Sequence, residues 1–238
     1  MKIARTSFLI VVVLALAWMF FQLFMHYDSR EGLNPVARYY AEQGPDETGA
    51  ANLVTSVVVT YRGLDTLGEV TILFLTAAII GILLRTERGS RLKPVRENSE
   101  FLTTASRILI PVIALFGVYI FLNGHLTPGG GFQGGAVLAS SFILLLMAFT
   151  GRRMGHRILD FTESISGFSF VLIALLGVVL AAGFLDNSIL PPGRFGTLFS
   201  AGAIPLIYSL IGLKVGAELS NIILELNQIQ GRDDDPGS

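Results

Sequence analysis

The stretch Asn123-Gly-His-Leu-Thr-Pro-Gly-Gly-Gly-Phe-Gln-Gly-Gly135 lies between two long apolar runs, Ala105 to Leu122 and Phe132 to Phe149. Glycine allows backbones to approach closely or to adopt positive φ, and Pro128 lacks a backbone donor, so the stretch interrupts helical structure. In a bilayer, irregular backbone persists only where other protein covers it or water lines it. The sequence therefore predicts that this segment meets a partner or borders a cavity.

Apolar residues dominate the rest of the chain as well. Of its 238 residues, 52% are hydrophobic and 15% are charged, which disfavours a soluble domain. A bilayer core of about 30 Å requires roughly 20 apolar residues for each helix. We therefore expect an all-α, polytopic integral membrane protein with about six transmembrane helices. The predicted spans are Phe8 to Met25, Leu67 to Leu84, Ala105 to Leu122, Phe132 to Phe149, Ile165 to Phe184 and Gly196 to Val215.

Two features of the composition exclude other classes of protein. The net charge of -1 offers no case for nucleic-acid binding. Cysteine is absent, so the chain forms no disulfide, thiolate metal site or iron-sulfur cluster with its own cysteines. We expect no cofactor and no metal in this chain, and any redox chemistry would belong to another subunit.

The distribution of basic residues predicts an orientation, since Lys and Arg bias their loops toward the cytoplasm. The connections after the second and fourth predicted spans are basic, with Arg85, Arg88, Arg91, Lys93, Arg96, Arg107, Arg152, Arg153 and Arg157. The first loop and the glycine-rich loop are poor in basic residues. Together with Lys2 and Arg5, this pattern predicts that both termini lie inside. The bulky residues after the first apolar run favour an uncleaved anchor over a signal peptide.

The pattern GHxxPGGGFxGG, from Gly124 to Gly135, resembles the B subunit of Mrp-type sodium/proton antiporters and its counterpart in membrane-bound hydrogenases. The segment Gly212-Leu-Lys-Val-Gly-Ala-Glu218 is also similar to that subunit. Upstream, the segment from Asn52 to Glu69 resembles the C-terminal end of the antiporter A subunit, or the small hydrogenase subunit that matches it. Together, the resemblances cover nearly the whole chain beyond Asp46.

The resemblance implies a fusion of two parts that usually belong to different subunits, so the two parts are expected to lie side by side in one complex. Residues 1–85 form a two-helix module like the A-subunit tail, and residues 86–104 form a cytoplasmic basic linker. Residues 105–230 form a four-helix module like the antiporter B subunit, and residues 231–238 form an acidic tail.

The implied function is that of a membrane subunit of an Mrp-type antiporter module in the cytoplasmic membrane, within a redox-driven ion-pumping complex such as a membrane-bound hydrogenase. The chain would contribute helix packing and part of the path for Na⁺ and H⁺. Its partners would be other antiporter-like subunits, hydrogenase or other redox subunits, and lipid. A purely structural bridging subunit and a stand-alone secondary transporter stay open, although a transporter usually has matching broken helices in two repeated halves. Neither HExxH nor GxSxG occurs, so we expect no catalysis by this chain alone.

Asp65 and Glu69 open the second predicted span and lie on one helix face, four residues apart. Asp65 fits a helix N-terminus, where the macrodipole favours acids, and it is also a candidate for the ion path. Glu69 lies about one turn deeper, where an unpaired charge facing lipid is costly. We expect Glu69 to face a hydrated path or a basic partner and to act as an ion relay. The short apolar run Ala51 to Thr60 before them is predicted to be a short interfacial or buried helix, although its local pattern also fits a strand.

His125 has two interpretations. An unperturbed histidine pKa of about 6.5 suits proton exchange, but the ring could equally fix the turn by a hydrogen bond to a backbone carbonyl. Thr127 and Pro128 resemble a helix cap and a first-turn proline. The following glycines are predicted to serve helix packing and the loop, and the positions are Gly129, Gly130, Gly131, Gly134 and Gly135.

Lys214 and Glu218 lie one helical turn apart, near the cytoplasmic end of the last predicted span. They could form a structural pair with a snorkelling lysine stem, or move protons if the helix continues to Leu226 and places Lys214 deeper. Glu163 is expected to be a helix N-terminal acid and Asp186 a loop or cap residue.

Overall fold

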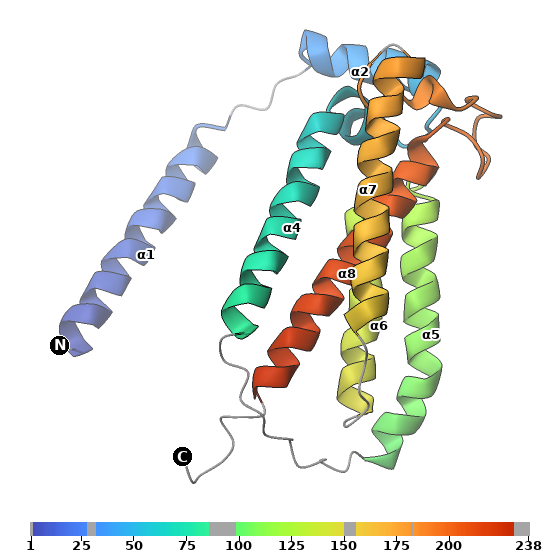
Figure 1. Cartoon of the computed structure of the whole chain (residues 1–238). Helices are drawn as coiled ribbons and strands as arrows, with labels where there is room; N and C mark the ends of the chain where they lie inside the picture. The colour runs from blue at the N-terminus through green and yellow to red at the C-terminus, as the bar shows by residue number, and fades with distance from the viewer. Residues whose placement is uncertain (1, 28–31, 86–98, 150–155, 182, 231–238) are drawn as a thin grey trace. The chain divides into compact units, whose positions relative to one another are not determined.

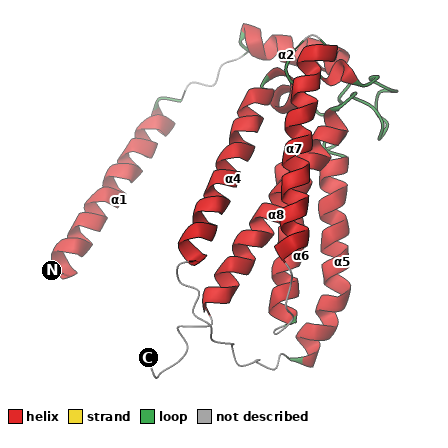
Figure 2. Ribbon diagram, viewed as in Figure 1, coloured by secondary structure: helices red, strands yellow, loops and turns green. Residues whose placement is uncertain are grey.

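The computed structural model describes residues 2–27, 32–85, 99–149, 156–181 and 183–230. The described residues form helices joined by turns and loops, and they contain no strand (Figure 2). The prediction of an all-α protein is therefore confirmed. Most of the expected basic linker, the acidic tail, and Arg152 and Arg153 lie outside the described residues. The chain divides into two units, Met1–Arg38 and Tyr39–Ser238.

The first unit consists mainly of α1, Lys2–Met25. This helix is apolar around its whole circumference from Phe8 onward, which is the pattern of a single helix surrounded by apolar material. Its only ring pair among the described residues joins Trp18 and Phe21, with centroids 5.9 Å apart. A residue window from Arg5 to Met25 is long and apolar enough to cross a membrane.

The second unit contains the remaining helices (Figure 1). In chain order they are α2 (Pro35–Thr48, which begins in the first unit), α3 (Leu53–Thr55), the π-helix η1 (Ser56–Tyr61), α4 (Gly63–Arg85), α5 (Glu100–Leu122), α6 (Gly131–Ala148), α7 (His156–Leu180), the 3-10 turn η2 (Asn187–Ile189) and α8 (Ile204–Gln230). The run from Ala51 to Thr60 is thus largely helical, because α3 continues directly into η1.

Six of the described helices are long and apolar enough to span a bilayer, as predicted. The helices α7 and α8 differ most from the predicted bounds. The helix α7 begins at His156 and ends at Leu180 instead of covering Ile165 to Phe184. The last helix begins at Ile204 instead of Gly196 and continues to Gln230 instead of ending at Val215.

The physical reason for the α8 shift lies in the loop before it. Gly193 and Gly196 have positive φ and Pro191 and Pro192 precede them, so Phe195, Leu198 and Phe199 belong to an irregular segment although they are apolar. Beyond Val215, polar residues such as Glu218 and Asn221 stay inside the helix because they contact other polar groups. Counting apolar residues along the sequence does not reveal these polar contacts between side chains.

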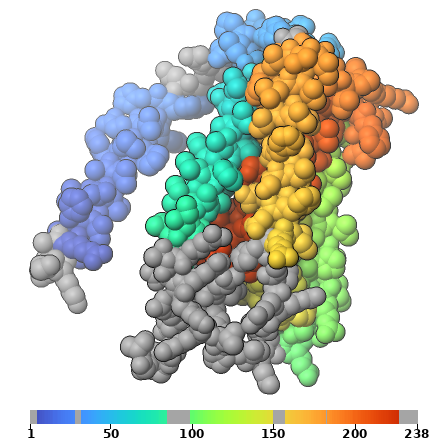
Figure 3. Space-filling view, viewed as in Figure 1, coloured from blue at the N-terminus to red at the C-terminus, as the bar shows by residue number. Residues whose placement is uncertain are grey.

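The helix α8 lies at the centre of the second unit. It packs against α4, α5, α6 and α7. In the space-filling view only small parts of it are visible between α4 and α7 (Figure 3). Its buried side chains include Ile207, Ile211 and Val215, which form one core with Phe170 of α7.

Glycines permit the close approach of α6 to its neighbours. A Cβ atom added at Gly134 would lie 2.7 Å from the Gly117 carbonyl oxygen of α5. One added at Gly135 would lie 2.8 Å from the Gly212 carbonyl oxygen of α8. The helix backbones are thus in direct contact, and neither glycine position has room for a side chain. Small residues at such positions are typical of tightly packed membrane helices.

Candidate functional site

The most unusual feature inside the predicted membrane region is the ion pair between Lys214 and Glu218 on α8. Lys214 lies ten residues after Ile204, about 15 Å along the helix at roughly 1.5 Å per residue, so it lies near the middle of the 23-residue span Ile204–Leu226. The pair is therefore deeper than the predicted bounds placed it, because α8 begins later and continues further. The Lys214 side chain is 7% exposed and that of Glu218 is 0% exposed.

Several contacts hold this pair in place. Lys214 Nζ donates a hydrogen bond to Glu218 Oε1 and lies 4.9 Å from the centre of the Phe74 ring of α4. Gly167 of α7 leaves room for the lysine stem, since a Cβ there would lie 3.4 Å from Lys214 Cδ. The pair is thus enclosed by three helices, which rules out a lysine that snorkels to the surface. Burying both charges is costly, and removing one partner from such a pair typically costs about 3–5 kcal/mol.

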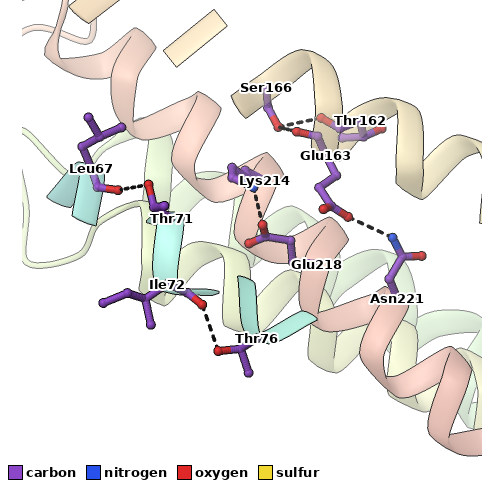
Figure 4. A network of polar contacts seen from close by, with 10 residues as sticks. All are labelled: Leu67, Thr71, Ile72, Thr76, Thr162, Glu163, Ser166, Lys214, Glu218 and Asn221. Carbon is purple, nitrogen blue, oxygen red and sulfur yellow. Dashed lines mark hydrogen bonds and ion pairs between the residues drawn. The ribbon is translucent and has the colours of Figure 1, made fainter. Parts of the chain in front are cut away.

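A further group of polar side chains adjoins the pair on the side of α7 (Figure 4). Asn221 Nδ2 donates to Asp160 Oδ1 and to Glu163 Oε2, each at 3.1 Å. The expectation that Glu163 is a helix N-terminal acid is wrong, because α7 already begins at His156 and the Glu163 carboxylate contacts Asn221 of α8. Sequence reasoning missed this contact, since the two residues are far apart in the chain.

Asp65 and Glu69 lie away from this enclosed group. Asp65 is in the first turn of α4 and its Oδ2 lies 2.5 Å from Arg62 Nη2, with both side chains exposed. Glu69 is exposed and makes no hydrogen bond or ion pair with any described residue. The expected basic partner of Glu69 is therefore not found in the described part of this chain.

His125 is fully buried in the glycine-rich turn. Its Nε2 forms a hydrogen bond with the Thr197 carbonyl oxygen at 3.2 Å. Burial lowers the pKa of the ring, and the nearby carbonyls of Thr197, Leu122 and Leu198 oppose this shift in part. A neutral, carbonyl-bound ring agrees with the interpretation in which His125 fixes the turn.

The same turn is clamped by α3 and its cap residue in the N-terminal module. Asn52 Nδ2 donates to the carbonyl oxygens of Gly124 at 2.8 Å and Thr127 at 3.0 Å. The Asn52 backbone N–H donates to the His125 carbonyl oxygen, and Thr55 Oγ1 donates to the Gly124 carbonyl oxygen at 2.6 Å. These donors cover the carbonyls that the interrupted helix leaves unpaired, so the chain itself supplies a partner for this segment. The prediction that Thr127 caps the following helix is wrong, because α6 begins only at Gly131. Thr127 Oγ1 instead donates to the Asn123 carbonyl oxygen.

Among the described residues no group of three His, Cys, Asp or Glu side chains could hold a metal ion. The candidate site is the group of ionisable side chains around Lys214 and Glu218, whereas Glu69 is exposed on α4.

Residues 101–221 match the family model described as a domain related to the MnhB subunit of Na⁺/H⁺ antiporter. The chain belongs to this MnhB-related family. Residues 2–101 of the MnhB-related chain match a second model, described as the E subunit of MBH.

Solved structures agree with both matches. One chain of the membrane-bound sulfane sulfur reductase, an archaeal respiratory membrane complex, is 41% identical with a TM-score of 0.81, and the match covers 93% of this chain and 97% of that one. A chain of the Mrp complex from a Dietzia species shares the fold, with 24% identity and a TM-score of 0.77. That match covers 98% of the MnhB-related chain and 27% of the Dietzia chain.

The B subunit of the Na⁺/H⁺ antiporter of Bacillus subtilis is 37% identical over 86 residues, which are 36% of this chain and 54% of that protein. The match thus spans about half the length of this curated relative. These comparisons confirm the prediction of a multi-pass membrane subunit of the Mrp antiporter type, which fuses an MnhB-related part to a part that matches the MBH E subunit.

Proposed function

We propose that this chain carries part of the proton path of a sodium/proton exchange module, with the Lys214–Glu218 pair at its centre. The observation that supports this proposal is a fully enclosed ion pair halfway along a membrane-spanning helix. Ionisable residues inside a membrane are costly and are usually found on ion pathways. A buried lysine–glutamate pair can bind and release one proton as the charges around it change, which is the chemistry that such a path requires.

Glu69 takes the second role in this proposal. Its exposed carboxylate lies about 9 Å along α4 from Gly63, so it lies within a predicted span at roughly 1.5 Å per residue. A charge that faces lipid there is unfavourable, and the described residues of this chain offer it no partner. Glu69 would therefore meet a basic group or a hydrated path supplied by a neighbouring subunit.

The proposed setting is a multi-subunit complex in the cytoplasmic membrane that couples redox chemistry in other subunits to ion movement. The likeness to a chain of an archaeal respiratory complex supports this setting over a free-standing exchanger. Both termini would face the cytoplasm, since Lys2 and Arg5 precede the first predicted span and Arg107 and Arg157 lie in the N-terminal parts of α5 and α7. Na⁺ and H⁺ are the proposed ions.

A structural bridging role is the second candidate, and one observation favours it. The clamp between Asn52 and the glycine-rich turn joins the two parts of the chain without any ionisable group. A chain that only bridges its neighbours would need this clamp and would not need Lys214 or Glu218.

The test uses the complete complex in inverted membrane vesicles, with a fluorescent probe of ΔpH and added Na⁺. Glu218→Gln and Glu69→Gln are each expected to lower Na⁺-dependent proton movement while the complex assembles normally. Glu100→Gln, at an exposed acid in the first turn of α5, is the matched control. Normal exchange in both test variants would favour the bridging role.

Affinity capture of the tagged chain from native membranes tests the setting. Mass spectrometry should find antiporter-like subunits together with redox subunits. Antiporter-like subunits alone would indicate a plain exchanger, and a chain recovered alone would contradict the complex.

A further inference from the structure

The polar side chains beyond the ion pair form a graded series from the membrane interior to the surface. Lys214, Glu218 and Asn221 lie at positions i, i+4 and i+7 of α8 and thus on one helix face. Asp160 and Glu163 lie one turn apart on α7 and both contact Asn221. Exposure increases along the series, because Glu218 is fully buried, Glu163 is half-buried and Asp160 is exposed.

At the buried end of this series, one carboxylate oxygen of Glu218 lacks a hydrogen-bond donor among the described residues. Glu218 Oε1 accepts from Lys214, whereas Oε2 is buried and has no hydrogen-bond donor among the described residues. The Glu163 carboxylate lies near enough for its negative charge to act on Glu218 (Figure 4). A second negative carboxylate near Glu218 favours one additional bound proton on the pair of acids.

We infer that Glu163 is the group that exchanges protons with Glu218, and that Asp160 and Asn221 connect it to the surface at the start of α7. This inference rests on the proposed function, because it assigns the continuation of the same path. A proton on Glu218 Oε2 supplies the donor that this buried oxygen lacks. Asn221 is a positioning residue, since its amide holds the Glu163 and Asp160 carboxylates by two hydrogen bonds.

The step is a proton transfer without electron transfer. The O–H bond at Glu218 breaks while an O–H bond forms at a Glu163 oxygen through one bridging water, since no hydrogen bond joins the two carboxyl groups directly. The proton then leaves to water beside exposed Asp160. Lys214 keeps its ammonium protons and stabilises the carboxylate that remains on Glu218. In the reverse direction Glu163 delivers the proton and the ion pair becomes protonated again.

The charged groups around this step are few. On α8 they are Lys214, Glu218 and Glu225, and on α7 they are Arg157, Asp160 and Glu163. The helix α4 faces the pair with Phe74, and α6 carries no charged residue. Any pH dependence of Glu218 therefore reflects Lys214 and the α7 acids.

The test compares Glu163→Gln, Glu163→Asp and the Glu100→Gln control in the intact complex. We expect Glu163→Gln to reduce Na⁺-dependent proton movement by at least about tenfold, as for the loss of a proton-transfer group, and Glu163→Asp to retain most of it. A second readout is labelling of Glu218 by dicyclohexylcarbodiimide, which reacts with protonated carboxyl groups in apolar surroundings, measured by mass spectrometry on captured, assembled complex. In Glu163→Gln the midpoint of labelling against pH should move to lower pH, because a negative neighbour has been removed.

The outcomes separate this inference from the proposed function. If Glu218→Gln abolishes exchange but Glu163→Gln leaves both exchange and the labelling midpoint unchanged, the role of Glu163 is overturned and the central pair stands. If Glu218→Gln itself exchanges normally, the proposed function fails. A loss of exchange in Glu163→Gln with an unchanged labelling midpoint would indicate a structural effect and would also overturn the inference.

Discussion

Replacing Lys214 by methionine isolates the energetic role of the buried pair. Methionine keeps the unbranched stem that lies beside Gly167 and Phe74 but removes the ammonium group. Glu218, which is fully buried, must then either stay charged without a partner or bind a proton. The first option costs about 3–5 kcal/mol. The second costs about 3.7 kcal/mol at pH 7, calculated from an unperturbed glutamate pKa of about 4.3 and about 1.36 kcal/mol per unit.

Both routes therefore predict a loss of roughly 3–4 kcal/mol for Lys214→Met at neutral pH. The double variant Lys214→Met/Glu218→Gln removes both charges and should recover most of this stability without recovering exchange. The assay is the half-life of the assembled complex in mild detergent at a fixed elevated temperature, followed by size-exclusion chromatography. A single variant as long-lived as the natural protein, or a double variant no better than the single one, would refute the reasoning.

Three further predictions concern the fold around the site. Gly135→Ala should destabilise the complex by about 1–3 kcal/mol, because its Cβ would meet the Gly212 carbonyl oxygen, whereas Gly68→Ala, with open space around it, should have little effect in the same heat-inactivation assay. Asn52→Ala should cost about 1–3 kcal/mol by leaving the Thr127 carbonyl unpaired and removing one of the two donors to Gly124, and faster cleavage of the glycine-rich turn by added protease would reveal it. The lowered pKa of His125 means that the unfolded state binds more protons, so its contribution to stability should be complete above about pH 6.5 and decline as pH falls below that value. Heat-inactivation half-lives measured across this range should show the decline, and His125→Gln should weaken it.

The sequence was sufficient to predict the number of spans, because apolar runs of bilayer length leave few alternatives. It was also sufficient for the family, because the glycine-rich motif and the segment around Lys214 are distinctive. The bounds of α7 and α8 were less accurate. Apolar loop residues such as Phe199 extended one predicted helix at its start, and polar residues such as Asn221 shortened it at its end.

The polar contacts inside the site could not be predicted in the same way. The spacing of Lys214 and Glu218 indicated a pair, but its depth depended on where α8 begins and ends. The contact of Glu163 with Asn221 joins residues 58 positions apart on two helices, and only their packing brings them together. Glu69 shows the opposite case, since it is exposed and the described residues of this chain offer it no partner.

The clamp on the glycine-rich turn gives a physical reason for the fusion of the two parts. The turn between α5 and α6 leaves backbone carbonyls that need donors in a membrane environment, and Asn52 and Thr55 supply them. When the two parts are separate chains, these hydrogen bonds must form between subunits. Joining them converts this association into an intramolecular one with a high effective concentration. Thr55 also accepts a hydrogen bond from Tyr208, near the start of α8. The clamp therefore also contacts α8, the helix that carries the Lys214–Glu218 pair.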